Sequence, residues 1–512
     1  MEQLATLLPP LVAIGVALAT RRTLLALFLG VWSGAVARPA LEGQGAWALV
    51  SGTADVFRVY LWNEASDSFR IEILGFIAAL LAMVGVMSRA GGVAGLVDLG
   101  LRFARGRRSA MLLTWVSGLA VFFDDLANCM LVGSSLRPLS DRLRISREKL
   151  AYLVDSTAAP VAGLSLLSTW VAFQISLYEP LLPEVGIEAD ALAVFAGSLP
   201  YRSYCWLALC FGGLVAATGR DFGPMRRAEA RAQRSGELVR PGAKAALSEG
   251  LARMEPAPGM PRAPHRAWLP VAVTLLVSAV AVVLSGNGAW AIFLGSGFGL
   301  ATAVALASLA PRLPLREIAR AAAGSGSTLV YAVTLLFLAW MIGAVCKDLG
   351  TAETLVALLG DALPALWLPL LLFATAASVA FATGSSWSTM SILIPNAVPL
   401  AAALGGPDAG LLVVLAISAV LDGAIFGDHC SPISDTTVLS SVASGCDHLD
   451  HVRTQVPYAL LVAGVAALVG YAPVLVAPGL GPWPGLLFGA ALLAGLLQLL
   501  GRRPEAPSAE PA

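Results

Sequence analysis

Three aspartates, Asp422, Asp428 and Asp435, lie within residues 421–441, between apolar segments that are each long enough to cross a bilayer. A carboxylate in hydrocarbon costs roughly 2.5–3.5 kcal/mol even on a lenient insertion scale, so three in one stretch call for a function. Pro432 has no N–H, and it therefore leaves the carbonyl of Asp428, four residues earlier, without its helical partner. A broken helix that exposes carbonyls beside carboxylates and hydroxyls suits a small hard cation. We interpret this stretch as the ion site of a secondary transporter.

Three further polar stretches interrupt apolar segments: a turn at residues 124–128, a break at 155–160 and a turn at 384–389. Pro160 should free the carbonyl of Ser156 for the same reason that applies to the first break. We expect all four stretches to converge if the two halves of the chain face each other. Their carboxylates could hold a dehydrated cation when ionised and a proton when neutral. If Na⁺ and H⁺ compete for the same carboxylates, exchange follows from mass action together with alternating access.

Helical spacing places Asp428 and Asp435 seven residues apart on one face, with Ser431 between them. We predict that the transported Na⁺ is held by the carboxylates and neutral groups of Asp155, Asp428, Asp435, Asn128, Ser431, Ser434 and Thr436. A second set is predicted to gate the site or to support its ligands: Asp124, Asp125, Ser156, Thr157, Ser385, Ser386, Ser388, Thr389, Asp422 and His429. We expect no cofactor besides the transported Na⁺ and H⁺.

Several of these residues also have a plainer structural interpretation. Asp124 and Asp125 could be ion ligands or a gate at the tip of a hairpin, and the two roles stay open. Asp422 could pair with a nearby donor, and Asp435 could cap the helix that follows it. His429 is more often a hydrogen-bonded interior histidine than a ligand.

A polar cluster follows the broken stretch: Asp447, His448, Asp450 and His451. The three-residue spacing of its histidines would fit a metal pair, but the cluster also fits a solvated cytoplasmic turn, which we favour. Two glycines in the broken stretch, Gly423 and Gly427, could allow close helix packing or could loosen the break.

The composition indicates a membrane protein. Of 512 residues, 57% are hydrophobic and 13% are charged, whereas a soluble domain has about 25% charged residues. The apolar runs are continuous rather than alternating, which favours helices over a closed barrel. The net charge is zero, so no bulk electrostatic attraction to nucleic acid is implied. Six cysteines without a C-x-x-C pair argue against a disulfide framework or a zinc site.

Arginine clusters orient the predicted crossings, because cytoplasmic loops carry an excess of Arg and Lys. Residues 109–136 have basic residues on both sides, yet two crossings would need about 40 residues and this segment has 28. We therefore predict a re-entrant hairpin with its turn near Asp124. The other segments of the first half are predicted crossings at residues 7–20, 24–37, 71–87, 150–178 and 196–217, with an outside loop that carries Glu42, Asp55 and Glu64.

The second half has a similar organisation. Its predicted elements are crossings at residues 268–284, 290–309, 327–345, 411–441, 457–475 and 484–500, and a hairpin at 367–404. Ungapped matches such as Gly85 with Gly343 and Phe123 with Phe381 share one offset of 258 residues. An odd number of crossings per copy would make the two copies inverted repeats.

The predicted fold is therefore an all-α polytopic membrane protein with two inverted repeats and one extra C-terminal helix. Each repeat would have about five transmembrane helices, a re-entrant hairpin and a broken helix. The predicted boundaries are residues 1–218 for the first repeat, 219–266 for a cytoplasmic linker, 267–477 for the second repeat, 478–503 for the extra helix and 504–512 for a disordered tail. The linker is rich in arginine with scattered proline and glycine, which is typical of a flexible connection.

Four short segments carry a resemblance to a known family: GDHCSPISDTT at 427–437, FFDDLAN at 122–128, VDSTAAP at 154–160 and ATRR at 19–22. Together they resemble the NhaC-type Na⁺/H⁺ antiporters of the ion transporter superfamily, from the first apolar run to about residue 475. The resemblance implies inverted repeats and cation/proton exchange. Related members exchange organic acids such as malate or lactate with cations, so the resemblance specifies the mechanism more firmly than the solute. No family feature matches the linker.

We predict a secondary active transporter that exchanges Na⁺ for H⁺ across the cytoplasmic (inner) membrane by alternating access. The alternative is an organic-acid/cation exchanger on the same fold, which would need a fixed positive partner, and no Arg or Lys lies inside the four polar stretches. An enzyme such as an intramembrane hydrolase is disfavoured because HExxH and GxSxG motifs are missing. The expected partners are the lipid bilayer, Na⁺ and H⁺, and a homodimer is compatible with the sequence. We expect the linker and the C-terminus in the cytoplasm.

Overall fold

The computed structural model describes residues 5–503 except 21, 102–103, 244–255, 310–312, 325, 360–363, 472, 475–476, 478 and 480. The predicted tail, 504–512, and the middle of the predicted linker lie outside the described residues. The described chain is helical and contains no strand, and its isolated β-bridge joins Asp221 to Arg502.

The helices before the long gap are α2 (Leu8–Thr20), α3 (Thr23–Leu41), the 3₁₀ helix η1 (Gly45–Trp47), α4 (Ala48–Asp55), the π-helix η2 (Val56–Leu61), α5 (Trp62–Ser66), α6 (Ser68–Arg89), α7 (Gly92–Leu101), α8 (Arg107–Ala120), α9 (Asp125–Arg142), α10 (Arg147–Asp155), α11 (Ala159–Leu164), α12 (Thr169–Tyr178), η3 (Glu179–Leu181), η4 (Pro183–Val185), α13 (Ala191–Ser198), η5 (Leu199–Tyr201), α14 (Ser203–Thr218) and α15 (Gly223–Ser235).

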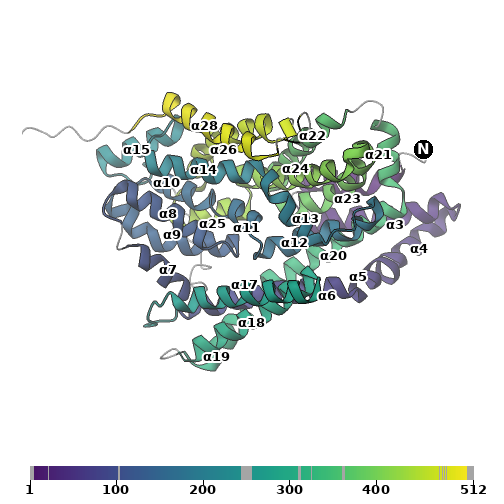
Figure 1. Ribbon diagram of the computed structural model, residues 1–512, viewed down its shortest axis with the longest axis horizontal. Coiled ribbons are helices and arrows are strands. Elements are labelled where there is room, and N and C mark those ends of the chain that lie inside the picture. Colours follow the sequence, from purple (N-terminus) through teal and green to yellow (C-terminus); the bar gives the residue numbers. More distant parts are fainter. Residues whose placement is uncertain are drawn as a thin grey trace, which may run out of the picture.

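The helices after the gap are α17 (His265–Ser285), α18 (Gly288–Ser308), α19 (Leu315–Ala323), α20 (Gly326–Asp348), α21 (Thr351–Leu359), η6 (Ala365–Trp367), α22 (Leu368–Thr383), α23 (Ser386–Gly405), η7 (Gly406–Asp408), α24 (Ala409–Cys430), α25 (Asp435–Ser444), α26 (His448–Gly470) and α28 (Trp483–Leu500). In Figure 1, α17, α18 and α19 lie along one edge of the molecule, and α26 and α28 lie along the opposite edge.

Among the described residues, ten helices are long and apolar enough to cross a membrane, or eleven if one bent pair counts as a single span. Large apolar side chains face outward on these helices, for example Leu276, Val283 and Leu284 on α17. Such a surface suits contact with lipid, where the helix satisfies its own backbone hydrogen bonds. The prediction of an all-α polytopic membrane protein is confirmed, whereas the inversion of the two repeats stays a prediction.

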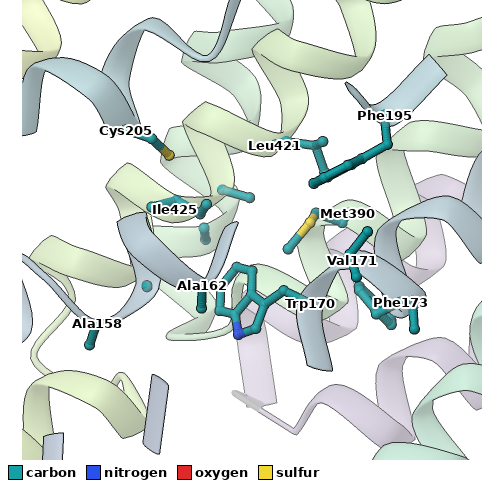
Figure 2. Packing of buried hydrophobic residues seen from close by; sticks show 14 of the residues in the cluster. Ala158, Ala162, Trp170, Val171, Phe173, Phe195, Cys205, Met390, Leu421 and Ile425 are labelled. Carbon is teal, nitrogen blue, oxygen red and sulfur yellow. The ribbon is translucent and has the colours of Figure 1, made fainter. Parts of the chain in front are cut away.

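The centre of the molecule is packed from both halves of the chain. Figure 2 shows side chains from α11, α12, α13 and α14 beside others from α23 and α24. Trp170 of α12 and Leu421 of α24 are almost fully buried there. The apolar faces of the two halves therefore hold the broken helices in place.

Helix breaks occur where proline, glycine and polar residues predict them. α8 ends before residues 121–124 and α9 begins at Asp125; α22 and α23 meet at residues 384–385; α24 and α25 flank residues 431–434; and residues 156–158 separate α10 from α11. With 14 residues, α8 is too short to cross a hydrocarbon core of about 30 Å. The helices on both sides of residues 384–385 are each long enough to cross.

A second break within the predicted crossing at residues 150–178 was not predicted. Residues 165–168 separate α11 from α12, and the chain bends there by 48°. Ser168 begins α12 by accepting a hydrogen bond from the backbone N–H of Val171, so the sequence signal was a serine cap rather than a proline.

Two expectations about the first half were wrong. The predicted outside loop is helical over α4, η2 and α5, and Glu64 is buried there in an ion pair with Arg70. The predicted crossing at 196–217 is divided at Arg202, because Pro200 ends the first part in a 3₁₀ turn before α14 begins.

The expectation of a flexible linker is also wrong for residues 223–235, which form α15. One face of α15 buries Met225, Ala228 and Ala232, and this apolar face holds the helix against the rest of the chain. Asp221, just before α15, forms a buried ion pair with Lys149 of α10 and accepts a hydrogen bond of 2.5 Å from the hydroxyl of Tyr458 in α26. The first part of the linker, residues 221–235, is therefore packed against the transmembrane helices.

Close packing of α22 against α24 explains the presence of Gly423 and Gly427, for which the sequence allowed two roles. A Cβ on Gly427 would lie 2.5 Å from the carbonyl oxygen of Ala377 and 2.6 Å from the backbone nitrogen of Phe381, both in α22. A Cβ on Gly423 would lie 2.3 Å from the carbonyl oxygen of Phe373. Both glycines therefore allow the two backbones to approach, as small residues do between membrane helices.

Replacing Gly427 by alanine should lower the melting temperature of the detergent-solubilised protein, because overpacking against backbone costs about 1–3 kcal/mol. Gly464, in the middle of α26, is the matched control, since a Cβ at this position would have nothing within 4 Å. Gly464→Ala should raise the melting temperature slightly, because alanine favours helix over glycine by about 1 kcal/mol. Intrinsic tryptophan fluorescence during heating gives the melting temperature of each variant. Shifts of the same sign in the two variants would contradict the role of Gly427 in close helix packing.

Candidate ion-binding site

A cavity of about 110 Å³ forms where three of the four predicted polar stretches meet. Most of its polar lining comes from the start of α9, the turn between α22 and α23, and the ends of α24 and α25 on both sides of the break, and Thr169 of α12 adds a hydroxyl. The residues that line it are Ile77, Leu81, Asp124, Asp125, Leu126, Thr169, Trp170, Tyr331, Ala332, Gly384, Ser385, Ser386, Trp387, Asp428, Asp435 and Thr436. We call this space the central cavity.

The turn at residues 384–385 is fixed against the broken stretch. Gly384 has φ of +68° and ends α22, and a Cβ there would lie 2.7–2.8 Å from atoms of Ile433. Only glycine combines this backbone conformation with so close an approach. Ser385 then begins α23 by accepting a hydrogen bond from the N–H of Ser388 at 3.3 Å. The glycine-serine turn therefore places Ser386 beside the break.

Asp428 is the buried carboxylate of the broken stretch that faces the central cavity. Its side chain accepts a hydrogen bond of 3.3 Å from the hydroxyl of Ser386, and the residue is 5% exposed. Ser431, in the break itself, donates to the carbonyl of Phe381 at 2.8 Å. The N–H of Ser431 bonds the carbonyl of Asp428 at 3.1 Å, so the break re-forms one tight turn at the carbonyl that Pro432 leaves free.

The two aspartates at the hairpin turn have different surroundings. Asp124 caps α9, accepting from the N–H of Ala127 at 2.8 Å and from the hydroxyl of Thr169 at 3.4 Å. Asp125 is the first residue of α9 and lines the same cavity. Asp124 thus has a structural role in addition to its place in the lining.

Asp155 lies outside the lining of the central cavity, in the fold between α10, α25 and α26. Its Oδ2 accepts hydrogen bonds from Gln455 at 2.5 Å and from Thr437 at 3.2 Å. The Thr437 hydroxyl also lies 3.4 Å from the carbonyl oxygen of Asp428. Because that hydroxyl has a single hydrogen, it serves one of the two oxygens at a time, and it connects the two aspartates.

Two buried oxygens of predicted ligands have no hydrogen-bond partner. The Asn128 amide donates to the carbonyls of Gly118, Val121 and Thr157 at 2.7–3.1 Å, which fixes the orientation of the amide. Asn128 Oδ1 and Asp155 Oδ1 are both buried without a hydrogen-bond partner. Buried oxygens without donors are rare in proteins, and they are the kind of group that a dehydrated cation satisfies.

The remaining predicted ligands are neutral or exposed. The hydroxyls of Ser434 and Thr436 lie 3.0 Å apart, and Thr436 lines the central cavity. Asp435 is exposed to that cavity as the first residue of α25. The cap position belongs to Ser434, so Asp435 does not cap the helix but sits in its first turn, where the helix dipole favours a negative charge.

Four predicted supporting residues donate to nearby backbone carbonyls and do not line the central cavity. They are Ser156 and Thr157, which donate to Leu153, and Ser388 and Thr389, which donate to Ser385. Over the described part of the chain, no three His, Cys, Asp or Glu side chains form a group that could hold a metal ion. The three predicted carboxylate ligands are therefore divided between the central cavity and the enclosed position of Asp155.

Asp422 does pair with a donor. Arg202 donates to it at 3.0 Å, and both side chains are fully buried. The N–H of Tyr204 and the hydroxyl of Tyr471 also donate to Asp422, at 2.6 and 3.2 Å. The hydroxyl of Tyr204 is in turn 2.8 Å from Nδ1 of His429, an interior histidine whose Nε2 has no partner.

The expectation of a solvated turn at 447–451 is wrong for His451, which is fully buried. His451 lies 2.8 Å from Ser441 Oγ through Nδ1 and 2.8 Å from Gln455 Oε1 through Nε2. His448 Nε2 lies 2.6 Å from the carbonyl oxygen of Pro432. The start of α26 thus packs behind the break, because Asp447 caps the helix and turns its histidines inward.

Sequence reasoning missed Gln455, Thr437 and Arg202. Gln455 is the one amide in the apolar run of α26 and sits one turn after His451, which was a usable signal. Thr437 belongs to the quoted motif but was not selected. Arg202 stands alone between two apolar helices, where a charged residue indicates an interior partner.

A larger space of about 470 Å³ adjoins the central cavity and shares Tyr331, Gly384, Ser385 and Asp435 with it. We call it the vestibule. It reaches Arg22, between α2 and α3.

Comparison with known proteins gives a family match. A model for the Na⁺/H⁺ antiporter family matches residues 161–473. An uncharacterized protein of Haemophilus influenzae is 30% identical over 488 residues, which cover 91% of this chain and 90% of the relative. Two shorter matches are each 37% identical: the arginine/ornithine antiporter ArcD of Halobacterium salinarum, over 28% of each chain, and the malate-2H⁺/Na⁺-lactate antiporter of Bacillus subtilis, over 18% of this chain and 19% of the relative.

Proposed function

Because this chain belongs to the Na⁺/H⁺ antiporter family, we propose that it exchanges Na⁺ for H⁺ across the cytoplasmic membrane by alternating access. The family makes it a multi-pass membrane antiporter, a transporter rather than an enzyme. The resemblance of its motifs to Na⁺/H⁺ antiporters is thereby confirmed. The choice of Na⁺ and H⁺ as the exchanged ions is our proposal.

One observation carries this proposal: the carboxylate of Asp428 is buried at a helix break and faces the central cavity, and its backbone carbonyl shares the hydroxyl of Thr437 with Asp155. A buried carboxylate is costly unless a cation or a proton neutralises it. The carboxylate of Asp428 is therefore unfavourable without a bound cation or proton, so release of Na⁺ favours binding of H⁺ and release of H⁺ favours binding of Na⁺. This competition is what an exchanger requires.

The ligand set supports two positions for the cation. In the central cavity, Asp428 would bind Na⁺ with neutral oxygens such as those of Ser386 and Thr436. Behind the break, Asp155 and Asn128 each offer an unpaired buried oxygen. We propose that the cation moves between these positions, and that a proton replaces it at the carboxylates. Ser431 and Ser434 hold the break in shape between the two.

The proposal is tested by adding Na⁺ to proteoliposomes that contain a pH-sensitive dye and an imposed proton gradient. Na⁺ should dissipate the gradient at a rate that saturates with Na⁺ concentration, whereas choline should not. Protein-free vesicles are the control for leak. Equal rates with Na⁺, Li⁺, K⁺ and choline would contradict coupled exchange.

The second candidate is organic-acid/cation exchange. It is favoured by the vestibule, whose volume exceeds what a bare cation needs and whose lining includes Arg22. The matched Bacillus relative is named for malate and lactate. Counterflow of labelled lactate or malate in the same vesicles decides between the candidates, since only the second predicts solute movement.

The orientation is part of the proposal. The β-bridge between Asp221 and Arg502 places the start of the linker and the end of α28 on one side of the molecule. Both segments carry arginines, so we place this side in the cytoplasm. A protease added to right-side-out vesicles should leave the linker intact and should cut it only after the vesicles are opened.

A further inference from the structure

A third space, of about 170 Å³ and partly open to the surface at Lys347 and Glu184, lies between the two halves of the chain, and we call it the distal cavity. The same helices that line the central cavity, α6, α12, α20 and α23, also line this one. Along α20, Ala332 lines the central cavity and Trp340 lines the distal cavity, which at 1.5 Å per residue is a separation of about 12 Å. The vestibule meets α20 at Tyr331, so the distal cavity lies further along the helix, away from the vestibule.

The charges that line the distal cavity balance. Glu64 pairs with Arg70, and Glu184 pairs with Lys347. The guanidinium of Arg70 also lies over the ring of Trp340, with its carbon 4.7 Å from the centroid. A ligand with a single net charge would upset this balance. A zwitterion would keep it, with its anionic group near the two bases and its cationic group near the two acids.

Trp340 marks where an acceptor is needed. The residue is 4% exposed and its indole Nε1 has no hydrogen-bond partner. A buried Trp N–H usually finds a partner, so the wall of the distal cavity has an unused donor beside the Arg70 guanidinium. A carboxylate oxygen of a bound molecule would accept from this N–H and would lie close to a positive charge.

Most of the remaining lining is apolar and comes from Leu177, Pro180, Leu181, Ala339, Ala344 and Pro395, with Gly343 of α20 facing Pro395 of α23. Ser176 adds one hydroxyl, which donates to the carbonyl of Phe173 at 2.8 Å. The apolar residues suit a short hydrocarbon chain.

We propose that the distal cavity binds a zwitterionic α-amino acid with an aliphatic side chain. Its carboxylate accepts from Trp340 and lies by Arg70, its ammonium lies by Glu64 or Glu184, and its side chain contacts the apolar wall. This site is separate from the proposed Na⁺/H⁺ site, and nothing in the exchange proposal requires it. The transporter would then bind an amino acid on the side away from the vestibule, in addition to the ions that it exchanges.

Binding is measured on the full-length protein in nanodiscs by isothermal titration calorimetry, with L-leucine as the probe. Two analogues each lack one charged group: 4-methylpentanoate has no ammonium and 3-methylbutylamine has no carboxylate. L-leucine should bind at least about 10-fold more tightly than either analogue, since each analogue loses one charge-assisted hydrogen bond. Absence of L-leucine binding, or equal binding of an analogue, would overturn the proposal.

Two variants connect the binding to this cavity. Trp340→Phe keeps the ring and removes the N–H, and it should weaken L-leucine binding about 10-fold. Lys347→Gln, at a side chain that is 60% exposed, should weaken it in the same direction without disturbing the core. Trp268→Phe, at an exposed tryptophan of α17, is the matched control and should leave the affinity unchanged. Unaltered affinity in both cavity variants would place the ligand elsewhere and overturn the proposal.

Na⁺-driven proton movement in the same preparation separates the two proposals. If exchange occurs and L-leucine does not bind, the distal site is refuted and the exchanger stands. If L-leucine binds with the expected selectivity and Na⁺ moves no protons, the distal site stands and the exchanger is refuted.

Discussion

Asp428→Asn should reduce Na⁺-driven proton movement in proteoliposomes by at least about 100-fold. Asparagine has nearly the same shape and can still accept from Ser386, but it carries no charge to neutralise Na⁺ and cannot take up a proton. Loss of a charge-assisted contact of about 1.5–3 kcal/mol for each ion accounts for the size of the effect. The initial rate of dye dequenching after a Na⁺ pulse measures it.

Asp190→Asn is the matched control for this experiment. Asp190 caps α13 through hydrogen bonds from the N–H groups of Leu192 and Ala193, and asparagine caps a helix as well as aspartate does. The control should therefore insert, fold and exchange like the original protein. An Asp428→Asn protein that folds and still exchanges at the control rate would show that the ions pass elsewhere.

Arg202→Met should destabilise the protein by about 3–5 kcal/mol, because it leaves Asp422 as a buried charge without its partner. Arg202 also lies within 3.4 Å of the Gly163 carbonyl and the Gln174 amide oxygen, so its loss frees acceptors near the break that precedes α12. The melting temperature in detergent and the yield of folded, monodisperse protein measure the effect. Both should fall sharply.

The double variant Arg202→Met/Asp422→Leu tests the cause. Replacing a whole buried ion pair with apolar residues is often neutral, so the second substitution should recover much of the loss. Recovery should stay incomplete because Tyr204 and Tyr471 still donate into that space. Arg38→Met is the control: its partner Asp348 is partly exposed, and such a pair contributes about 0–1 kcal/mol. If Arg202→Met and Arg38→Met lowered the stability equally, burial of the Arg202–Asp422 pair would not be the cause of the loss.

The sequence predicted the helix breaks well because their causes are local. Pro432 removes a backbone donor, Gly384 adopts a positive φ, and Ser385 caps the next helix. Each effect acts within four residues, so it can be recognised without knowing the fold. The division at residues 165–168 was missed because serine caps are weaker signals than proline.

Partners that are distant in sequence could not be predicted in this way. Arg202 and Asp422 are 220 residues apart, and Gln455 reaches Asp155 across 300 residues. Helical periodicity assigns a side chain to a face but does not say which other helix that face meets. For the same reason the prediction grouped Asp155 with Asp428 and Asp435, although only the latter two line the central cavity.

A side chain of the linker, Arg220, provides hydrogen bonds to carbonyls at the C-terminal end of α28. Arg220 donates to the carbonyls of Gln498 and Gly501 at 3.2 and 2.9 Å, and a cation there also compensates the negative end of the helix dipole. Removing α28 would therefore leave Arg220 without these two acceptors and would remove one of the contacts that hold the start of the linker. Thus α28, which lies outside both predicted repeats, helps to hold in place the linker that joins them.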